Sequence, residues 1–99
     1  MSHFNEMDYP LTLAEFREWL LSKSLEDYVG CQHSCFSCPI FHCLHQKGVE
    51  VVCVLNSYTS LNNDVRLANP TWVTEFIDSI DSLSLDYSEI TAKDALGVL

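Results

Sequence analysis

The fold of this chain is decided by residues 49–81, which read VEVVCVLNSYTSLNNDVRLANPTWVTEFIDSID. Residues 49–55 are mostly β-branched or apolar, and residues 65–68 repeat that character after the turn-forming stretch 61–64, so the two runs predict a β-hairpin. Asn69 and Pro70 then predict a helix start, with Asn69 as the N-cap and Pro70 at the first helical position. Because two strands are marginally stable alone, the hairpin must pack on helices.

The helix predicted over about residues 70–82 is amphipathic. Glu75, Asp78 and Asp81 fall on one face, where water or a partner can reach them. The apolar residues recur at helical spacing on the other face and are Trp72, Val73, Phe76, Ile77 and Ile80. We therefore expect this helix to bury its apolar face in the core and to present carboxylates outward.

The N-terminal region predicts a long first helix. Thr12 and Glu15 have capping-box spacing, in which each side chain satisfies a backbone N–H of the other residue. Apolar residues continue at helical spacing after Glu15, and Gly30 suits the left-handed position that ends many helices. We therefore expect a helix over about residues 13–29, preceded by a flexible lead-in over residues 1–10.

Two short helices complete the expected elements. Cys38 and Pro39 resemble a helix start, because the missing N–H of proline costs nothing in the first turn. With Gly48 as its stop, this helix is expected over about residues 38–46. Another N-cap pattern begins at Thr91 and predicts a terminal helix. The residues expected to pack inward from that helix are Ala95, Leu96 and Leu99.

These elements together predict the fold class. A chain of 99 residues has room for one compact domain with a modest core. We expect a small single α+β domain over residues 1–99, in which three or four helices pack on a β-hairpin. A Cys/His-rich segment, residues 31–48, lies between the first helix and the hairpin.

The Cys/His-rich segment holds the chemically most suggestive side chains. Four cysteines and three histidines fall within residues 31–45. Zinc takes four Cys or His ligands, and Cys38 and His42 lie about one helical turn apart, so the best ligand set is Cys31, Cys35, Cys38 and His42. Structural zinc sites usually pair two short motifs across a longer separation, whereas these ligands are consecutive. The main expectation is therefore that the protein holds no cofactor, and zinc is the alternative.

The same cysteines also carry a resemblance to a known motif. The spacing Cys31-x3-Cys35-x2-Cys38 resembles, over eight residues, the three-cysteine motif of radical S-adenosylmethionine enzymes. The resemblance implies an iron–sulfur cluster held by three thiolates. Ser37 stands where those enzymes usually carry an aromatic residue, and 99 residues cannot build the barrel that they need.

Two further interpretations of the cysteines stay open. Cys35 and Cys38 at a helix N-terminus suit a redox dithiol, because the helix dipole stabilises a thiolate there. Such a thiol should react with alkylating agents well below pH about 8. The other interpretation is structural, with Cys43 and Cys53 as small core residues and the remaining thiols in a loop.

The charge balance excludes several functions. Fourteen acidic and five basic residues give a net charge of -9. Without a Lys/Arg surface to grip phosphate, direct binding to nucleic acid or to an anionic membrane is not expected. The net charge is -4 over residues 1–30, 0 over residues 31–68 and -5 over residues 69–99. The acidity therefore flanks a neutral, thiol-rich middle that could dock a partner.

The N-terminus predicts a cytoplasmic protein. It has neither the basic start nor the apolar run of a secretory signal, and no apolar stretch has the length of a transmembrane helix. Five cysteines, an odd number, fit a disulfide framework badly, so we expect reduced thiols. The chain also lacks a nucleophile elbow and a phosphate-cradling loop, which favours a non-enzymatic role.

The leading functional hypothesis is a small acidic, non-enzymatic protein-binding module or inhibitor. Its acidic helices, with Glu75, Asp78 and Asp81 as candidate contacts, would meet a basic protein partner, and nucleic-acid mimicry is a special case. A zinc-binding domain and a thiol redox protein are the alternatives from other classes. The plainest alternative is that the acidity only confers solubility.

Overall fold

The computed structural model describes residues 9–62, 65–83 and 89–99. Within these residues the chain forms an α+β domain with four helices and two antiparallel sheets, which confirms the predicted fold class. Most of the expected lead-in lies outside the described residues. The elements, in chain order, are α1 (Leu13–Leu21), β1 (Tyr28–Cys31), α2 (Pro39–Gln46), β2 (Val51–Val54), β3 (Tyr58–Leu61), β4 (Val65–Ala68), α3 (Thr71–Asp81), β5 (Glu89–Thr91) and α4 (Ala92–Gly97).

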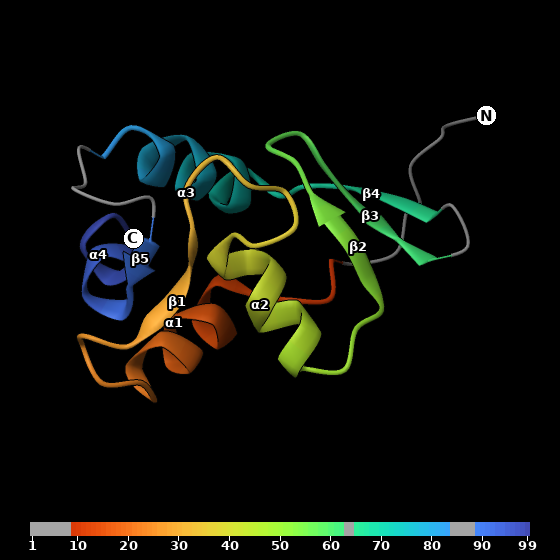
Figure 1. Ribbon diagram of the computed structural model, residues 1–99. Coiled ribbons are helices and arrows are strands. Elements are labelled where there is room, and N and C mark those ends of the chain that lie inside the picture. Colours follow the sequence, from red (N-terminus) through yellow and green to blue (C-terminus); the bar gives the residue numbers. More distant parts are fainter. Residues whose placement is uncertain (1–8, 63–64, 84–88) are drawn as a thin grey trace.

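The two sheets lie at opposite ends of the molecule, with α2 between them (Figure 1). Strands β2, β3 and β4 form a meander at one end, and β1 pairs with β5 at the other end beside α1 and α4. Helix α3 runs along one side. The largest core side chains come from the helices and from both sheets, and include Phe16, Leu20, Ile40, Leu44, Leu67, Val73, Phe76, Ile80 and Ile90.

The expected hairpin contains an additional strand. The sequence predicts a connection over residues 56–64, whereas Tyr58–Leu61 forms β3 between the other two strands. Thr59 pairs with Val54 on one side and with Leu67 on the other. The neighbouring Asn and Ser residues resemble a loop, but Tyr and Thr favour strands, and pairing on both sides decides the outcome.

The first helix is shorter than predicted. Helix α1 ends at Leu21, with Ser22 as its C-cap. Ser24 and Asp27 then form a turn, because the Asp27 N–H donates to the Ser24 carbonyl at 2.9 Å and the Asp27 carboxylate accepts from the Ser24 N–H at 2.9 Å. Such local side-chain bonds compete with helical ones. Residues 28–31 therefore leave the helix and form β1.

Gly30 lies inside β1 rather than at a helix end, which corrects its predicted role. A Cβ atom at this position would lie 2.6 Å from Pro39 N, 2.6 Å from the Ser37 carbonyl oxygen and 2.8 Å from the Cys38 carbonyl carbon. All three neighbours are backbone atoms, so no side-chain rotation could relieve the contacts. The strand can approach the start of α2 this closely only because residue 30 has no side chain.

The start of α3 also differs from the prediction. Pro70 is the N-cap, Thr71 is the first helical residue, and no side chain caps this helix. The Asn69 side chain instead donates to the Leu55 carbonyl at 2.5 Å and accepts from the Thr59 hydroxyl at 2.7 Å. Asn69 therefore ties the helix start to the three-stranded sheet.

The terminal helix begins as predicted. The Thr91 hydroxyl accepts from the Asp94 N–H at 3.3 Å, and the Asp94 carboxylate accepts from the Thr91 N–H at 3.1 Å, which completes a capping box. Ala95 is buried and Leu96 packs against the core. Leu99 is 41% exposed, so its predicted inward packing is wrong.

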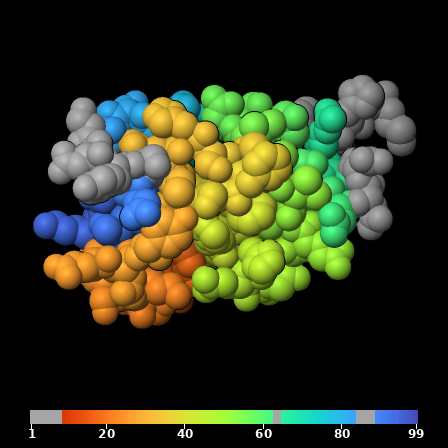
Figure 2. Space-filling view, in the orientation of Figure 1, coloured from red at the N-terminus to blue at the C-terminus, as the bar shows by residue number. Residues whose placement is uncertain are grey.

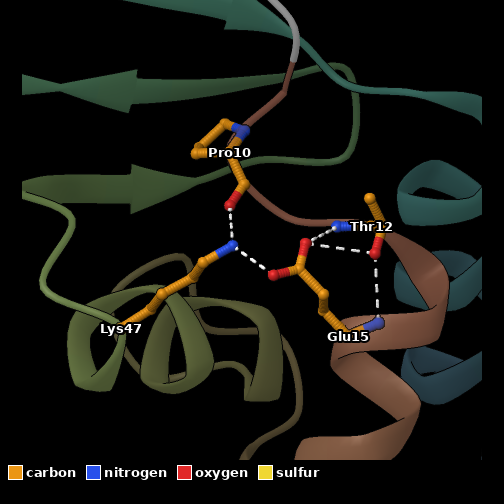
Figure 3. Close-up of polar contacts among 4 residues, drawn as sticks. All are labelled: Pro10, Thr12, Glu15 and Lys47. Carbon is orange, nitrogen blue, oxygen red and sulfur yellow. Dashed lines mark hydrogen bonds and ion pairs between the residues drawn. The ribbon is translucent and has the colours of Figure 1, made fainter.

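A polar cluster joins the start of α1 to the end of α2 (Figure 3). Thr12 and Glu15 form the predicted capping box, with both backbone N–H bonds at 3.1 Å. The Lys47 ammonium donates to the other Glu15 carboxylate oxygen at 2.7 Å and to the Pro10 carbonyl at 2.7 Å. The bond from Lys47, followed by those from Thr12, lowers the pKa of the Glu15 carboxyl.

Candidate functional site

Residues 32–38 form a closed loop between β1 and α2, which we call the cysteine loop. The Cys31 N–H donates to the Ser37 carbonyl at 2.7 Å and closes the base of the loop. The buried Gln32 side chain donates to the Ile80 carbonyl in α3 at 2.6 Å and to the Leu83 carbonyl just after this helix at 2.9 Å. The loop is thus fixed to α3 by hydrogen bonds to backbone atoms.

Cys38 begins α2, as the sequence predicts. It is the N-cap residue, and its Sγ accepts from the Phe41 N–H at 3.4 Å. Burial raises the pKa of the Cys38 thiol to about 11. This direction is opposite to the shift expected for a reactive thiolate at a helix N-terminus, so Cys38 remains protonated at neutral pH.

Cys31 and His42 belong to a polar chain beside the cysteine loop. The Tyr28 hydroxyl lies 3.3 Å from Cys31 Sγ and 3.3 Å from Ser37 Oγ, which in turn lies 3.1 Å from His42 Nε2. Burial, with a smaller contribution from His45, lowers the pKa of His42, so its imidazole is neutral at pH about 7. Cys31 and His42, two of the four predicted zinc ligands, are therefore linked to each other through the side chains of Tyr28 and Ser37.

Cys35 and Cys38 line a separate cleft of about 370 Å³, which we call the loop–α3 cleft. The cysteine loop, in gold, reaches the surface in the middle of the face drawn in Figure 2. The lining residues come from this loop, from the end of β2 with the residues after it, and from the C-terminal half of α3. They are His33, Ser34, Cys35, Cys38, Val54, Leu55, Asn56, Ile77, Asp78 and Asp81.

The structure brings together only parts of the predicted zinc set. Cys35 and Cys38 share the loop–α3 cleft, whereas Cys31 and His42 belong to the polar chain through Tyr28. Within residues 9–62, 65–83 and 89–99, no three His, Cys, Asp or Glu side chains are grouped so that they could hold a metal ion. Zinc and iron–sulfur binding both stay predictions that metal analysis must test.

The three predicted partner contacts, Glu75, Asp78 and Asp81, have different surroundings. Glu75 and Asp78 are exposed on α3, and Asp78 and Asp81 line the loop–α3 cleft. Asp81 accepts from the His33 N–H at 2.9 Å, and its other oxygen lies 3.8 Å from the His33 imidazole Nδ1. Asp81 therefore holds the cysteine loop to α3, while Asp78 faces solvent.

The rim of the cleft carries negative charge that the described chain does not neutralise. Among the described residues, the ion pairs join Lys47 to Glu15 and His33 to Asp81. Neither pair includes Asp78. The wall next to Asp78 is apolar, because the side chains of Leu55 and Ile77 line the same cleft. An apolar wall beside an unpaired carboxylate is the main chemical feature of this site.

Cys53 also reaches the cysteine loop, which sequence reasoning missed. Cys43 is buried as predicted, whereas Cys53 is only half-buried, and burial followed by the neighbouring Cys35 thiol raises the pKa of the Cys53 thiol. The Val54 N–H donates to the Cys35 carbonyl at 2.8 Å and aligns the two segments. No local spacing could signal this contact, since it forms only when the loop and the sheet are both folded.

No helix among the described residues has both the length and the apolar character needed to cross a membrane.

Known proteins add no constraint to this geometry. The functional assignment therefore depends on the residues of the cleft and the cysteine loop. Comparison with protein-family models, with curated proteins and with solved structures finds no match for this chain.

Proposed function

We propose that this protein is a non-enzymatic binding module that receives a basic side chain of a protein partner in the loop–α3 cleft. The observation that carries the proposal is the combination of Leu55 and Ile77 with the unpaired carboxylate of Asp78 in one cleft. Arginine and lysine side chains match this combination, because each has an aliphatic stem that can contact the apolar residues and a charged head that can contact the carboxylate.

The size of the cleft favours a single side chain as the occupant. Its volume of about 370 Å³ is near the lower end of the range of roughly 300–1,000 Å³ that is typical of ligand pockets. A side chain that enters it would place methylene groups against Ile77 and Leu55. The charged head would then lie at the rim beside Asp78.

Arginine fits the rim better than lysine does. Asp78 and Asp81 are three residues apart on α3, so their side chains are neighbours on the helix surface. A planar guanidinium has several N–H donors and can bind one carboxylate with two bonds or bridge two carboxylates. Asp81 accepts one bond from the His33 N–H at 2.9 Å, and a carboxylate has further acceptor positions.

The overall charge supports the same kind of partner at longer range. A net charge of -9 attracts basic proteins and repels acidic ones. Such long-range attraction is screened over about 8–10 Å at physiological salt, so binding should weaken as salt is added. The contacts inside the cleft would provide the part of the affinity that resists salt.

A titration with a capped Gly-Arg-Gly peptide, followed by microscale thermophoresis, tests the proposal. We expect Asp78→Asn to weaken binding by at least roughly tenfold, since a charge-assisted hydrogen bond contributes about 1.5–3 kcal/mol and each 1.4 kcal/mol is about a factor of ten. Glu26→Gln is the matched control, because Glu26 is exposed, carries the same charge and does not line the cleft. Equal loss in both variants, or equal binding of a capped Gly-Glu-Gly peptide, would overturn the proposal.

A further inference from the structure

Cys35 and Cys53 come close together where the backbone of the cysteine loop is hydrogen-bonded to β2. The Val54 N–H donates to the Cys35 carbonyl at 2.8 Å, and standard backbone dimensions then place the two Cα atoms at most about 7.6 Å apart. Disulfides usually span Cα separations of about 4.4–6.8 Å, so this upper limit lies about 1 Å above the usual range. The Cys35 thiol also adds to burial in raising the pKa of the Cys53 thiol, as expected for neighbouring thiols. We infer that Cys35 and Cys53 are an oxidisable pair that forms a reversible disulfide with a small-molecule disulfide as the oxidant.

The remaining cysteines are held in other contacts. Cys38 Sγ caps α2 through the Phe41 N–H, and Cys31 Sγ lies 3.3 Å from the Tyr28 hydroxyl. Cys43 is buried in the core. A bond between Cys35 and Cys38, the pair closest in sequence, would remove the cap of α2. A bond between Cys35 and Cys53 leaves every one of these contacts in place.

The chemistry is thiol–disulfide exchange in two steps. Cys35 lines the open cleft, so its thiolate attacks one sulfur of the small disulfide and releases one small thiolate, which takes up a proton. The Cys53 thiolate then attacks Cys35 Sγ and releases the second small thiol. The two cysteines lose two electrons and two protons in total, and the small disulfide gains them as two thiols.

The bond would join the cysteine loop covalently to β2. Cys35 is part of the lining of the loop–α3 cleft, so oxidation would hold that wall in one position. This consequence for binding rests on the proposed function. Formation of the disulfide does not rest on the proposed function, because it depends only on how close Cys35 lies to Cys53.

The direct test is disulfide mapping of the folded, full-length protein. The reduced chain is incubated with oxidised glutathione, free thiols are blocked with iodoacetamide, and linked peptides are identified by mass spectrometry. We expect the Cys35–Cys53 peptide to be the main internal link. The same reaction in denaturant should favour the pairs closest in sequence, such as Cys35 with Cys38. A main Cys35–Cys38 link in the folded chain would overturn the inference.

Two serine variants separate the roles of the thiols. Cys53→Ser should stop at a stable mixed disulfide of glutathione on Cys35, because the resolving thiol is missing. Cys31→Ser is the matched control, since Cys31 is also half-buried, and it should still form the Cys35–Cys53 link. An internal link at Cys35 in Cys53→Ser, or loss of the link in a folded Cys31→Ser protein, would contradict the assignment. Loss of arginine-peptide binding by Asp78→Asn is a separate readout, so the two proposals can fail independently.

Discussion

Gly30→Ala should destabilise the protein strongly, because the added methyl group has no space. Its Cβ atom would lie 2.6, 2.6 and 2.8 Å from three backbone atoms of residues 37–39. Overpacking of this kind costs about 1–3 kcal/mol, and contact with backbone on every side favours the upper half of that range. For a domain of this size each kcal/mol lowers Tm by about 4–8 °C, so we expect a fall of roughly 10 °C or more.

Gly97→Ala is the matched control for this experiment. Gly97 lies at the end of α4, and a Cβ atom there meets nothing within 4 Å. Alanine is the better helix former by up to about 1 kcal/mol, so Tm should stay the same or rise slightly. Thermal melting followed by circular dichroism compares the two variants. If Gly30→Ala melts at the same temperature as Gly97→Ala, the close approach of β1 to the start of α2 is wrong.

Three further predictions concern the sheet, the helix pair and metal binding. Thr59→Val should lower the free energy of unfolding, measured in urea, by about 2 kcal/mol. The reason is that the buried Thr59 hydroxyl donates to Asn69 Oδ1 and lies 2.7 Å from the Tyr9 hydroxyl. A loss below about 0.5 kcal/mol would contradict this network. Lys47→Met should return the pKa of Glu15 toward its ordinary value of 4.5. The wild type should therefore be more stable than the variant above that pH, and it should lose this advantage as the pH falls through the lowered pKa of Glu15. A stability difference that does not change with pH would contradict the assignment. The zinc hypothesis predicts stoichiometric zinc in elemental analysis and a lower Tm after chelation, and metal-free protein with an unchanged Tm would exclude it.

Elements with local end signals could be predicted from the sequence. The Thr91 capping box, the Cys38-Pro39 helix start and the apolar periodicity of α3 all depend on residues within a few positions of one another. Such short-range interactions are visible in sequence because the partners are close along the chain. The predicted and observed ends of these helices therefore agree within a few residues.

Elements that depend on distant partners could not be predicted. Strand β1 continues the apolar spacing of α1, and only its pairing with β5 distinguishes strand from helix. Glycine is common just after helices, so the sequence predicts Gly30 as a helix end, but in the structure Gly30 allows β1 to lie close to the backbone of residues 37–39. Strand β3 is likewise defined by pairing on both sides.

In the candidate site, too, the residues placed by local spacing could be predicted, and those placed by distant contacts could not. Asp78 and Asp81 could be placed on one face of a helix from spacing alone, and the structure puts both on the cleft. Leu55 and Cys35 come from other segments and reach the cleft only through tertiary folding. The closeness of Cys35 to Cys53 could not be predicted for the same reason, since an argument from sequence spacing pairs Cys35 with Cys38 instead.

The measurement that tests the central claim most directly is a map of amide chemical shifts during titration with the capped Gly-Arg-Gly peptide. Binding in the loop–α3 cleft predicts that the shifted amides are those of residues 33–38, 54–56 and 77–81, which line or flank it. The exposed carboxylates of Glu26 and Glu75 lie outside the cleft lining and serve as internal references. Saturable shifts confined to the cleft segments are the result that we expect. Shifts spread equally over all exposed acidic residues, or centred away from α3, would contradict the claim that this cleft binds a basic side chain.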